Sequence, residues 1–125
     1  MPRQPDDLHK NHQCIGYSPS TGGQALPWEY VAEGSEHSIE LPSRVIVNNV
    51  ESYIASCCAG LGLIQVPLFD VQHLLDAGAL VEVLPEHRPA PMPVSMLYPN
   101  RRQRSRRLAV FLDWFGAQMQ PFLAP

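Results

Sequence analysis

The hydrophobic pattern changes twice within a short stretch near the middle of the chain, and this change constrains the fold most. Residues 44–47 form a short β-branched run after Pro42, which is typical of a buried strand. Residues 63–66 form a second apolar run, which Pro67 closes. Between them, apolar residues recur at helical spacing: Val50, Tyr53, Ile54, Cys57, Cys58 and Leu61. A helix between two strands is the parallel crossover unit, so the stretch predicts an α/β fold.

Both ends of this predicted helix carry boundary signals. The side-chain oxygen of Asn49 can accept a hydrogen bond from a free N–H of the first turn, which predicts an N-cap there. Gly60 or Gly62 can adopt the left-handed conformation that ends a helix.

The flanking sequence continues the α/β pattern. We predict a strand at residues 14–17 and a hairpin formed by residues 28–31 and 37–41 around a turn at 33–36. A proline-rich connector follows residue 85 and favours extended chain. The other predicted elements are a helix at 67–78, strands at 80–84 and 94–99, and a last helix with an apolar stripe of Leu108, Phe111, Leu112, Phe115 and Met119.

Length and cysteine content point to one cytoplasmic domain. The 125 residues suit a single domain. The three cysteines, two of them adjacent, lie in apolar contexts and do not form a disulfide framework, which predicts a reducing cytoplasm. No apolar run is long enough to cross a membrane, and the N-terminus has no signal-peptide core.

The net charge of −3 conceals an asymmetry. Residues 1–100 hold eleven acidic and four basic side chains, whereas residues 101–107 hold five arginines. Arginines attract phosphates, but no aromatic residues interleave with these, so a solvated loop before a helix is the simpler interpretation. Arginine is electrostatically unfavourable at a helix N-terminus, which leaves an anionic partner or the acidic face of another subunit as alternatives.

Reactive side chains are present without a recognisable catalytic or metal-binding pattern. His9, His12 and Cys14 lie close in sequence, but a closed zinc site needs a fourth ligand, so a connecting loop is favoured over a metal site. Cys57 and Cys58 lie in the apolar stripe, away from the helix N-terminus that would activate a thiol. Nucleotide-binding and hydrolase motifs are absent. The sequence therefore predicts no metal, no cofactor and no enzyme.

The central stretch resembles the second effector-binding subdomain of LysR-type transcriptional regulators. Residues 47–67, VNNVESYIASCCAGLGLIQVP, carry the helix-opening Asn turn and the "a-G-L-G-i" ending of that family. Residues 74–85, LLDAGALVEVLP, resemble its "L-x-x-G-x-L-v-x-v-L-p" segment. The resemblance also covers Pro5 to Ile15, Trp28 and residues 94–99.

The resemblance implies a periplasmic-binding-protein-like (type II) effector domain, with a central mixed sheet and flanking helices. The family's regulators are much longer than this chain, so we expect a truncated effector domain without the winged helix-turn-helix. Residues 12–85 would form its second subdomain. Residues 86–125 would supply a crossover strand and a C-terminal helix that normally belong to the first subdomain.

The family binds its effector in the cleft between the two subdomains. Carried over by position, the binding residues here would be Tyr17, Ser18, Asn48, Asn49, Val50 and Glu51. The positive end of a helix dipole would favour a carboxylate at this turn, and ligands of open α/β sheets gather at the carboxyl ends of strands. The alternative is that the two asparagines only cap and turn the chain.

The resemblance implies a regulator that passes effector binding on to DNA-bound subunits, without direct DNA contact by this chain. The stripe of the last helix would be exposed unless it folds back on the sheet or pairs with a second copy through Leu108, Phe111, Leu112 and Phe115. The alternative is a stand-alone interaction protein that pairs with a full-length regulator and binds neither ligand nor DNA.

Overall fold

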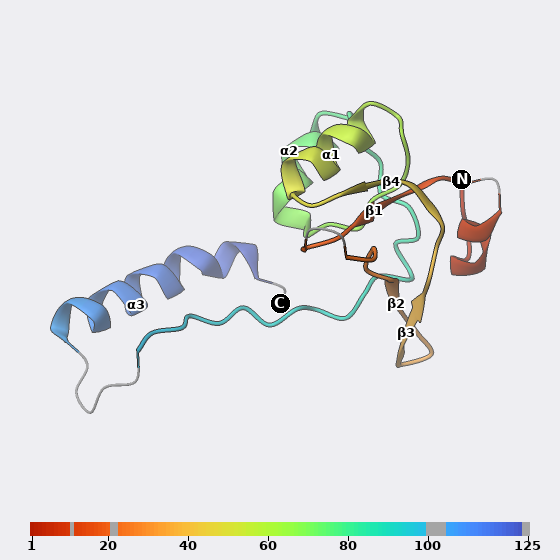
Figure 1. Ribbon diagram of the computed structural model, residues 1–125. Coiled ribbons are helices and arrows are strands. Elements are labelled where there is room, and N and C mark those ends of the chain that lie inside the picture. Colours follow the sequence, from red (N-terminus) through yellow and green to blue (C-terminus); the bar gives the residue numbers. More distant parts are fainter. Residues whose placement is uncertain (11, 21–22, 100–104, 124–125) are drawn as a thin grey trace. The chain divides into compact units, whose positions relative to one another are not determined.

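The computed structural model describes residues 1–10, 12–20, 23–99 and 105–123 (Figure 1). The chain divides into two compact units, residues 1–90 and residues 91–125. Each unit is described by itself.

A small parallel layer forms the centre of the first unit. Strands β1 (Cys14–Tyr17) and β4 (Ser43–Val47) pair in parallel. Leu63 bridges Cys14 on the other side of β1, with the Ile15 N–H 2.9 Å from the Leu63 carbonyl oxygen. The chain reaches Leu63 through helix α1 (Val50–Cys58), so the predicted parallel crossover is present, with a single bridge in place of its second strand.

The capping residue and the glycines in the sequence predicted the helix ends correctly. Asn49 caps α1, since its side-chain oxygen accepts from the Ser52 N–H at 2.8 Å. Gly60 follows α1 with a φ of 82°, as the left-handed ending requires. Helix α2 (Leu68–Asp76) is followed in the same way by Gly78, with a φ of 77°.

We expect Asn49→Ala to lower the free energy of unfolding by about 1 kcal/mol, because it removes this cap. Urea denaturation followed by circular dichroism measures the loss. Asn48→Ala is the matched control, since the Asn48 side chain accepts no hydrogen bond from the helix backbone among the described residues. Equal losses for the two variants would contradict a capping role.

The predicted hairpin is present with a tighter turn than expected. Strands β2 (Trp28–Ala32) and β3 (Ser35–Ile39) pair in antiparallel fashion around Glu33 and Gly34. Both turn residues have positive φ, 52° and 75°, as in the two-residue turns that match the twist of a hairpin.

The core of the first unit is small. Leu8, from a 3-10 helix at Pro5–His9, packs with Cys14 and Leu84. Half-buried Trp28, Leu41 and Leu63 surround this cluster. Ile15, Tyr53 and Val71 are the other buried apolar side chains of β1, α1 and α2.

Three predicted strands are wrong. Of residues 63–66, only Leu63 pairs with β1, and residues 80–84 and 94–99 form no strand. A strand needs a backbone partner over several residues; β1 provides one for Leu63 alone, and no strand in the described part of the chain pairs with the other two segments. The expected central mixed sheet is therefore two separate two-stranded sheets, one parallel and one antiparallel.

The expectation that residues 44–47 are buried is also wrong. β4 is an edge strand, and the Ile46 side chain is 52% exposed. The β-branched composition indicates a strand but not how deeply it is buried: Val45, which points to the opposite face from Ile46, is also 38% exposed.

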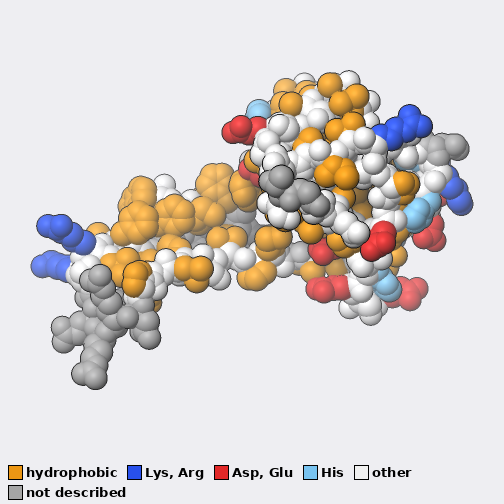
Figure 2. Space-filling view, in the orientation of Figure 1, with side chains coloured by type: hydrophobic (Ala, Val, Ile, Leu, Met, Phe, Trp, Pro, Cys, Tyr) orange, Lys and Arg blue, Asp and Glu red, His pale blue; other side chains and the backbone are white. Residues whose placement is uncertain are grey.

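The second unit contains helix α3 (Arg106–Met119) and a short 3-10 helix at Gln120–Phe122. The Ser105 hydroxyl oxygen caps α3 by accepting from the Leu108 N–H at 3.1 Å. No α3 residue is buried, and hydrophobic side chains gather along the helix (Figure 2). Of the predicted arginine run, residues 101–104 lie outside the described residues. Within those that are described, no helix is long and apolar enough to span a membrane.

Candidate functional site

The carboxyl ends of β1 and β4 meet at one edge of the parallel layer. Tyr17 pairs with Val47, and the Ser18 N–H donates to the Val47 carbonyl oxygen at 2.9 Å. Both segments leave the sheet directly after this pair, one into the loop that follows Ser18 and the other into α1. The structure thus brings the six residues predicted for the effector site to one edge: Tyr17, Ser18, Asn48, Asn49, Val50 and Glu51.

The N-terminus of α1 gives this edge a positive character. The N–H groups of Val50 and Glu51 lie in the first turn, where no intrahelical acceptor exists. The helix dipole adds partial positive charge at the same place. The Glu51 carboxylate is exposed and would repel an anion, so Glu51 can favour a bound anion only through its backbone N–H.

Ser18 is the least available of the six residues. Its side chain is buried, and its hydroxyl donates to the Ser20 carbonyl oxygen at 2.9 Å. Gly23 packs against this hydroxyl, and a Cβ atom at position 23 would lie only 2.9 Å from the Ser18 Oγ. Because its N–H and its hydroxyl both have protein partners, Ser18 shapes the loop more readily than it donates to a ligand.

Tyr53 lies beside the predicted residues, although its place in the apolar stripe of the helix indicates only a packing role. Its ring centroid is 5.2 Å from that of Tyr17. Its hydroxyl oxygen accepts from the Gln65 N–H at 2.9 Å. Burial raises the pKa of the Tyr53 phenol, so the group stays protonated at neutral pH and can donate a hydrogen bond.

The sequence pattern predicts Gln65 only as a strand residue, yet its side chain joins the segment after α1 to β2. Its amide nitrogen donates to the Glu29 carbonyl oxygen at 2.6 Å. Its amide oxygen accepts from the Glu29 N–H at 3.0 Å. Periodicity carries no signal for such a contact, because Glu29 lies far from Gln65 in the sequence.

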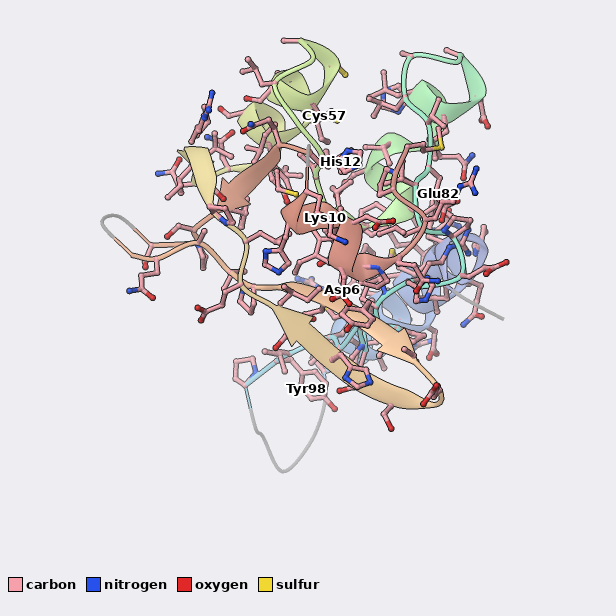
Figure 3. All side chains as sticks on the ribbon, turned by 90° about the vertical axis from the view of Figure 1, so that its right-hand side faces the viewer. Asp6, Lys10, His12, Cys57, Glu82 and Tyr98 are labelled. Carbon is pink, nitrogen blue, oxygen red and sulfur yellow. The ribbon has the colours of Figure 1, made fainter. Side chains whose placement is uncertain are left out.

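The other reactive side chains in the described part of the chain do not form a metal-binding cluster. Asp6, Lys10 and His12 belong to the N-terminal segment, whereas Cys57 lies on α1 (Figure 3). Among the described residues, no three metal-ligating side chains lie close enough to share an ion. Burial raises the pKa of the Cys14 and Cys57 thiols, which disfavours the reactive thiolate.

A shallow hollow lies on α3. It is lined by two cations from the first turn and three apolar side chains: Arg106, Arg107, Val110, Phe111 and Trp114. Phe111 and Trp114 are 52% and 56% exposed, and their ring centroids are 6.1 Å apart. This surface is open rather than enclosed.

Comparison with known proteins identifies the domain type. A sequence profile described as the LysR substrate binding domain matches residues 1–120. The chain belongs to this family. Among curated relatives, the LysR domain is 37% identical over 122 residues to the HTH-type transcriptional regulator YhjC of Escherichia coli, covering 98% of this chain and 40% of that protein. It is 38% identical over 112 residues to an HTH-type transcriptional repressor of Pseudomonas aeruginosa, covering 88% of this chain and 34% of that protein.

The LysR domain therefore spans about 40% of the first of these relatives and less of the second. Both relatives are named as regulators of transcription rather than as enzymes. Solved structures show the same fold. The regulatory domain of AphB from Vibrio vulnificus has a TM-score of 0.74 at 24% identity, covering 94% of this chain and 57% of that one. A full-length AphB variant also has a TM-score of 0.74, covering 90% of this chain and 37% of that one.

Proposed function

We propose that this LysR domain is the effector-sensing and oligomerisation portion of a transcriptional regulator, and that it binds a small anion at the carboxyl ends of β1 and β4. The Tyr17–Val47 pair carries the proposal, because it delivers the N-terminus of α1 to the same edge as the end of β1. Free backbone N–H groups and a helix dipole at such an edge favour a carboxylate.

We assign residues 12–85 to the second effector subdomain and residues 86–125 to elements of the first. The compact unit that ends at residue 90 supports a boundary in this region. Effector binding in the cleft between the subdomains would alter the geometry of paired subunits and so reach the DNA-bound part of the regulator. Direct DNA contact is not assigned to this chain, and we place the regulator in the cytoplasm.

We expect a carboxylate effector to raise the thermal midpoint of the chain. A ligand at 100 times its dissociation constant adds about 2.7 kcal/mol to the folded state. In a domain this small, that amount moves the midpoint by several degrees. Thermal-shift measurements with acetate, benzoate, succinate and glutamate test this, and flat curves around one cooperative transition would contradict carboxylate binding at this edge.

Asn48→Asp should abolish most of that shift. The substitution nearly preserves shape and places a negative charge beside the start of α1, where it repels an anionic ligand without opposing the helix dipole. Gln13→Glu is the matched control, since it makes the same amide-to-carboxylate change at the amino end of β1. Equal losses of the shift in both variants would indicate a general charge effect instead of a site at the strand ends.

The exposed face of α3 favours a second function, that of an interaction protein. Phe111 in the stripe is 52% exposed, and its neighbours Val110 and Trp114 are 62% and 56% exposed. The other stripe side chains are half-buried: Leu108, Leu112 and Phe115. Contiguous apolar surface of this kind marks protein interaction sites. In this role the chain pairs with a second copy or with a full-length regulator, and binds neither ligand nor DNA itself. Pairing without any ligand would favour this function, whereas a saturable carboxylate shift favours the first.

A further inference from the structure

One side chain ties the antiparallel hairpin to the parallel layer. The Gln65 amide donates to the Glu29 carbonyl oxygen at 2.6 Å and accepts from the Glu29 N–H at 3.0 Å. An N–H and a C=O of one residue satisfied together are what a neighbouring strand would provide. The Gln65 side chain thus takes the place of a strand at the outer edge of β2.

Gln65 is in turn bound by a residue that lies beside the candidate effector site. Its backbone N–H donates to the Tyr53 hydroxyl oxygen at 2.9 Å. Tyr53 is only 6% exposed, and its ring packs against that of Tyr17 at the end of β1. A continuous series of contacts therefore runs from Tyr17 through Tyr53 and Gln65 to Glu29 on β2.

We propose that Tyr53 and Gln65 are positioning residues that couple the strand-end site to the β2–β3 hairpin. A change at Tyr17 alters how firmly Gln65 holds Glu29, and hence how readily β2 opens. The identity of the site end rests on the function proposed above. An isolated two-stranded hairpin is only marginally stable. Each hydrogen bond to the outer edge of β2 therefore contributes a large share of the stability of the hairpin.

The hairpin supplies its own internal reference. The Val31 N–H points to the same outer edge as the Glu29 N–H, but it donates to the Arg88 carbonyl oxygen at 2.9 Å. Glu29 thus reports the Gln65 contact, while Val31 reports an attachment that does not involve Tyr53 or Gln65. If Gln65 is only a local cap, substitutions at Tyr17 will not reach Glu29.

Amide hydrogen exchange of the whole chain, measured by NMR without any carboxylate, tests the coupling. We expect Gln65→Leu to speed exchange of the Glu29 amide about fivefold, as the loss of one ordinary hydrogen bond predicts, with a smaller change at Val31. Tyr53→Phe, which removes only the hydroxyl, should also speed exchange at Glu29. Tyr17→Leu should do so as well, but should add nothing further in the Gln65→Leu background.

Phe69→Leu, at an exposed position on α2, is the control for replacing an aromatic ring by leucine outside this series of contacts, and it should leave Glu29 unchanged. Gln65→Glu is the second variant if Gln65→Leu does not fold, because it keeps the acceptor for the Glu29 N–H and loses only the donor. An unchanged Glu29 amide in Tyr17→Leu would overturn the coupling, as would an equal effect of Tyr17→Leu in both backgrounds. Because no carboxylate is present, failure here is separate from a flat carboxylate screen, which would refute only the proposed ligand.

Discussion

Leu84→Ala is expected to lower the free energy of unfolding by about 2–5 kcal/mol, the usual range for truncating a buried leucine. Leu84 is 5% exposed and packs with Leu8 and Cys14 in a core of few residues. A core this small has little capacity to refill the space. Leu84 also has a φ of 54°, in the left-handed region. This conformation is strained for alanine as well as for leucine, so the substitution relieves no backbone strain. Denaturant unfolding followed by tryptophan fluorescence measures the loss.

Val81→Ala is the control from the same segment. The Val81 side chain is 69% exposed, so its truncation should change the free energy of unfolding by no more than about 0.5 kcal/mol. Similar losses of unfolding free energy in the two variants would show that Leu84 does not anchor residues 80–84 in the core.

This segment shows why strands were predicted less well than helices. Asn49, Gly60 and Gly78 act on neighbours within one helical turn, so the sequence alone carried their signal. The turn at Glu33 and Gly34 is local in the same sense. Residues 80–84 have the apolar composition of a strand and do bury Leu84, but strand formation depends on a backbone partner elsewhere in the chain.

The residues of the candidate site also differ in how well the local sequence predicts them. The edge formed by Tyr17 and Asn48 could be predicted, because the order of strand, helix and strand places both at the carboxyl ends of parallel neighbours. The helical spacing predicts that the Tyr53 ring is buried, but it does not predict which group the Tyr53 hydroxyl binds. The contact between Gln65 and Glu29 joins positions distant in sequence, and no pattern in either segment indicates it.

Phe111→Glu is expected to weaken self-association of the chain, or its pairing with a full-length regulator, roughly 100-fold or more, as for a residue that anchors an interface. The Phe111 ring stacks against that of Phe115 at 5.7 Å and lies 6.1 Å from that of Trp114, yet it is 52% exposed. Three neighbouring aromatic rings give a rigid apolar surface, and a carboxylate at its centre must be desolvated when a partner covers it. Sedimentation equilibrium measures the dissociation constant.

Ala109→Glu separates this effect from a general effect of charge. Ala109 is half-buried on α3 and, at 100° per residue, lies about 160° around the helix from Phe111. The same charge placed there should leave the dissociation constant unchanged. A wild-type chain that stays monomeric at high micromolar concentration, and does not pair with a full-length relative, would exclude the α3 face as an interface. Loss of association in both variants would instead indicate that negative charge near the arginines of the first turn, and not the aromatic face, controls pairing.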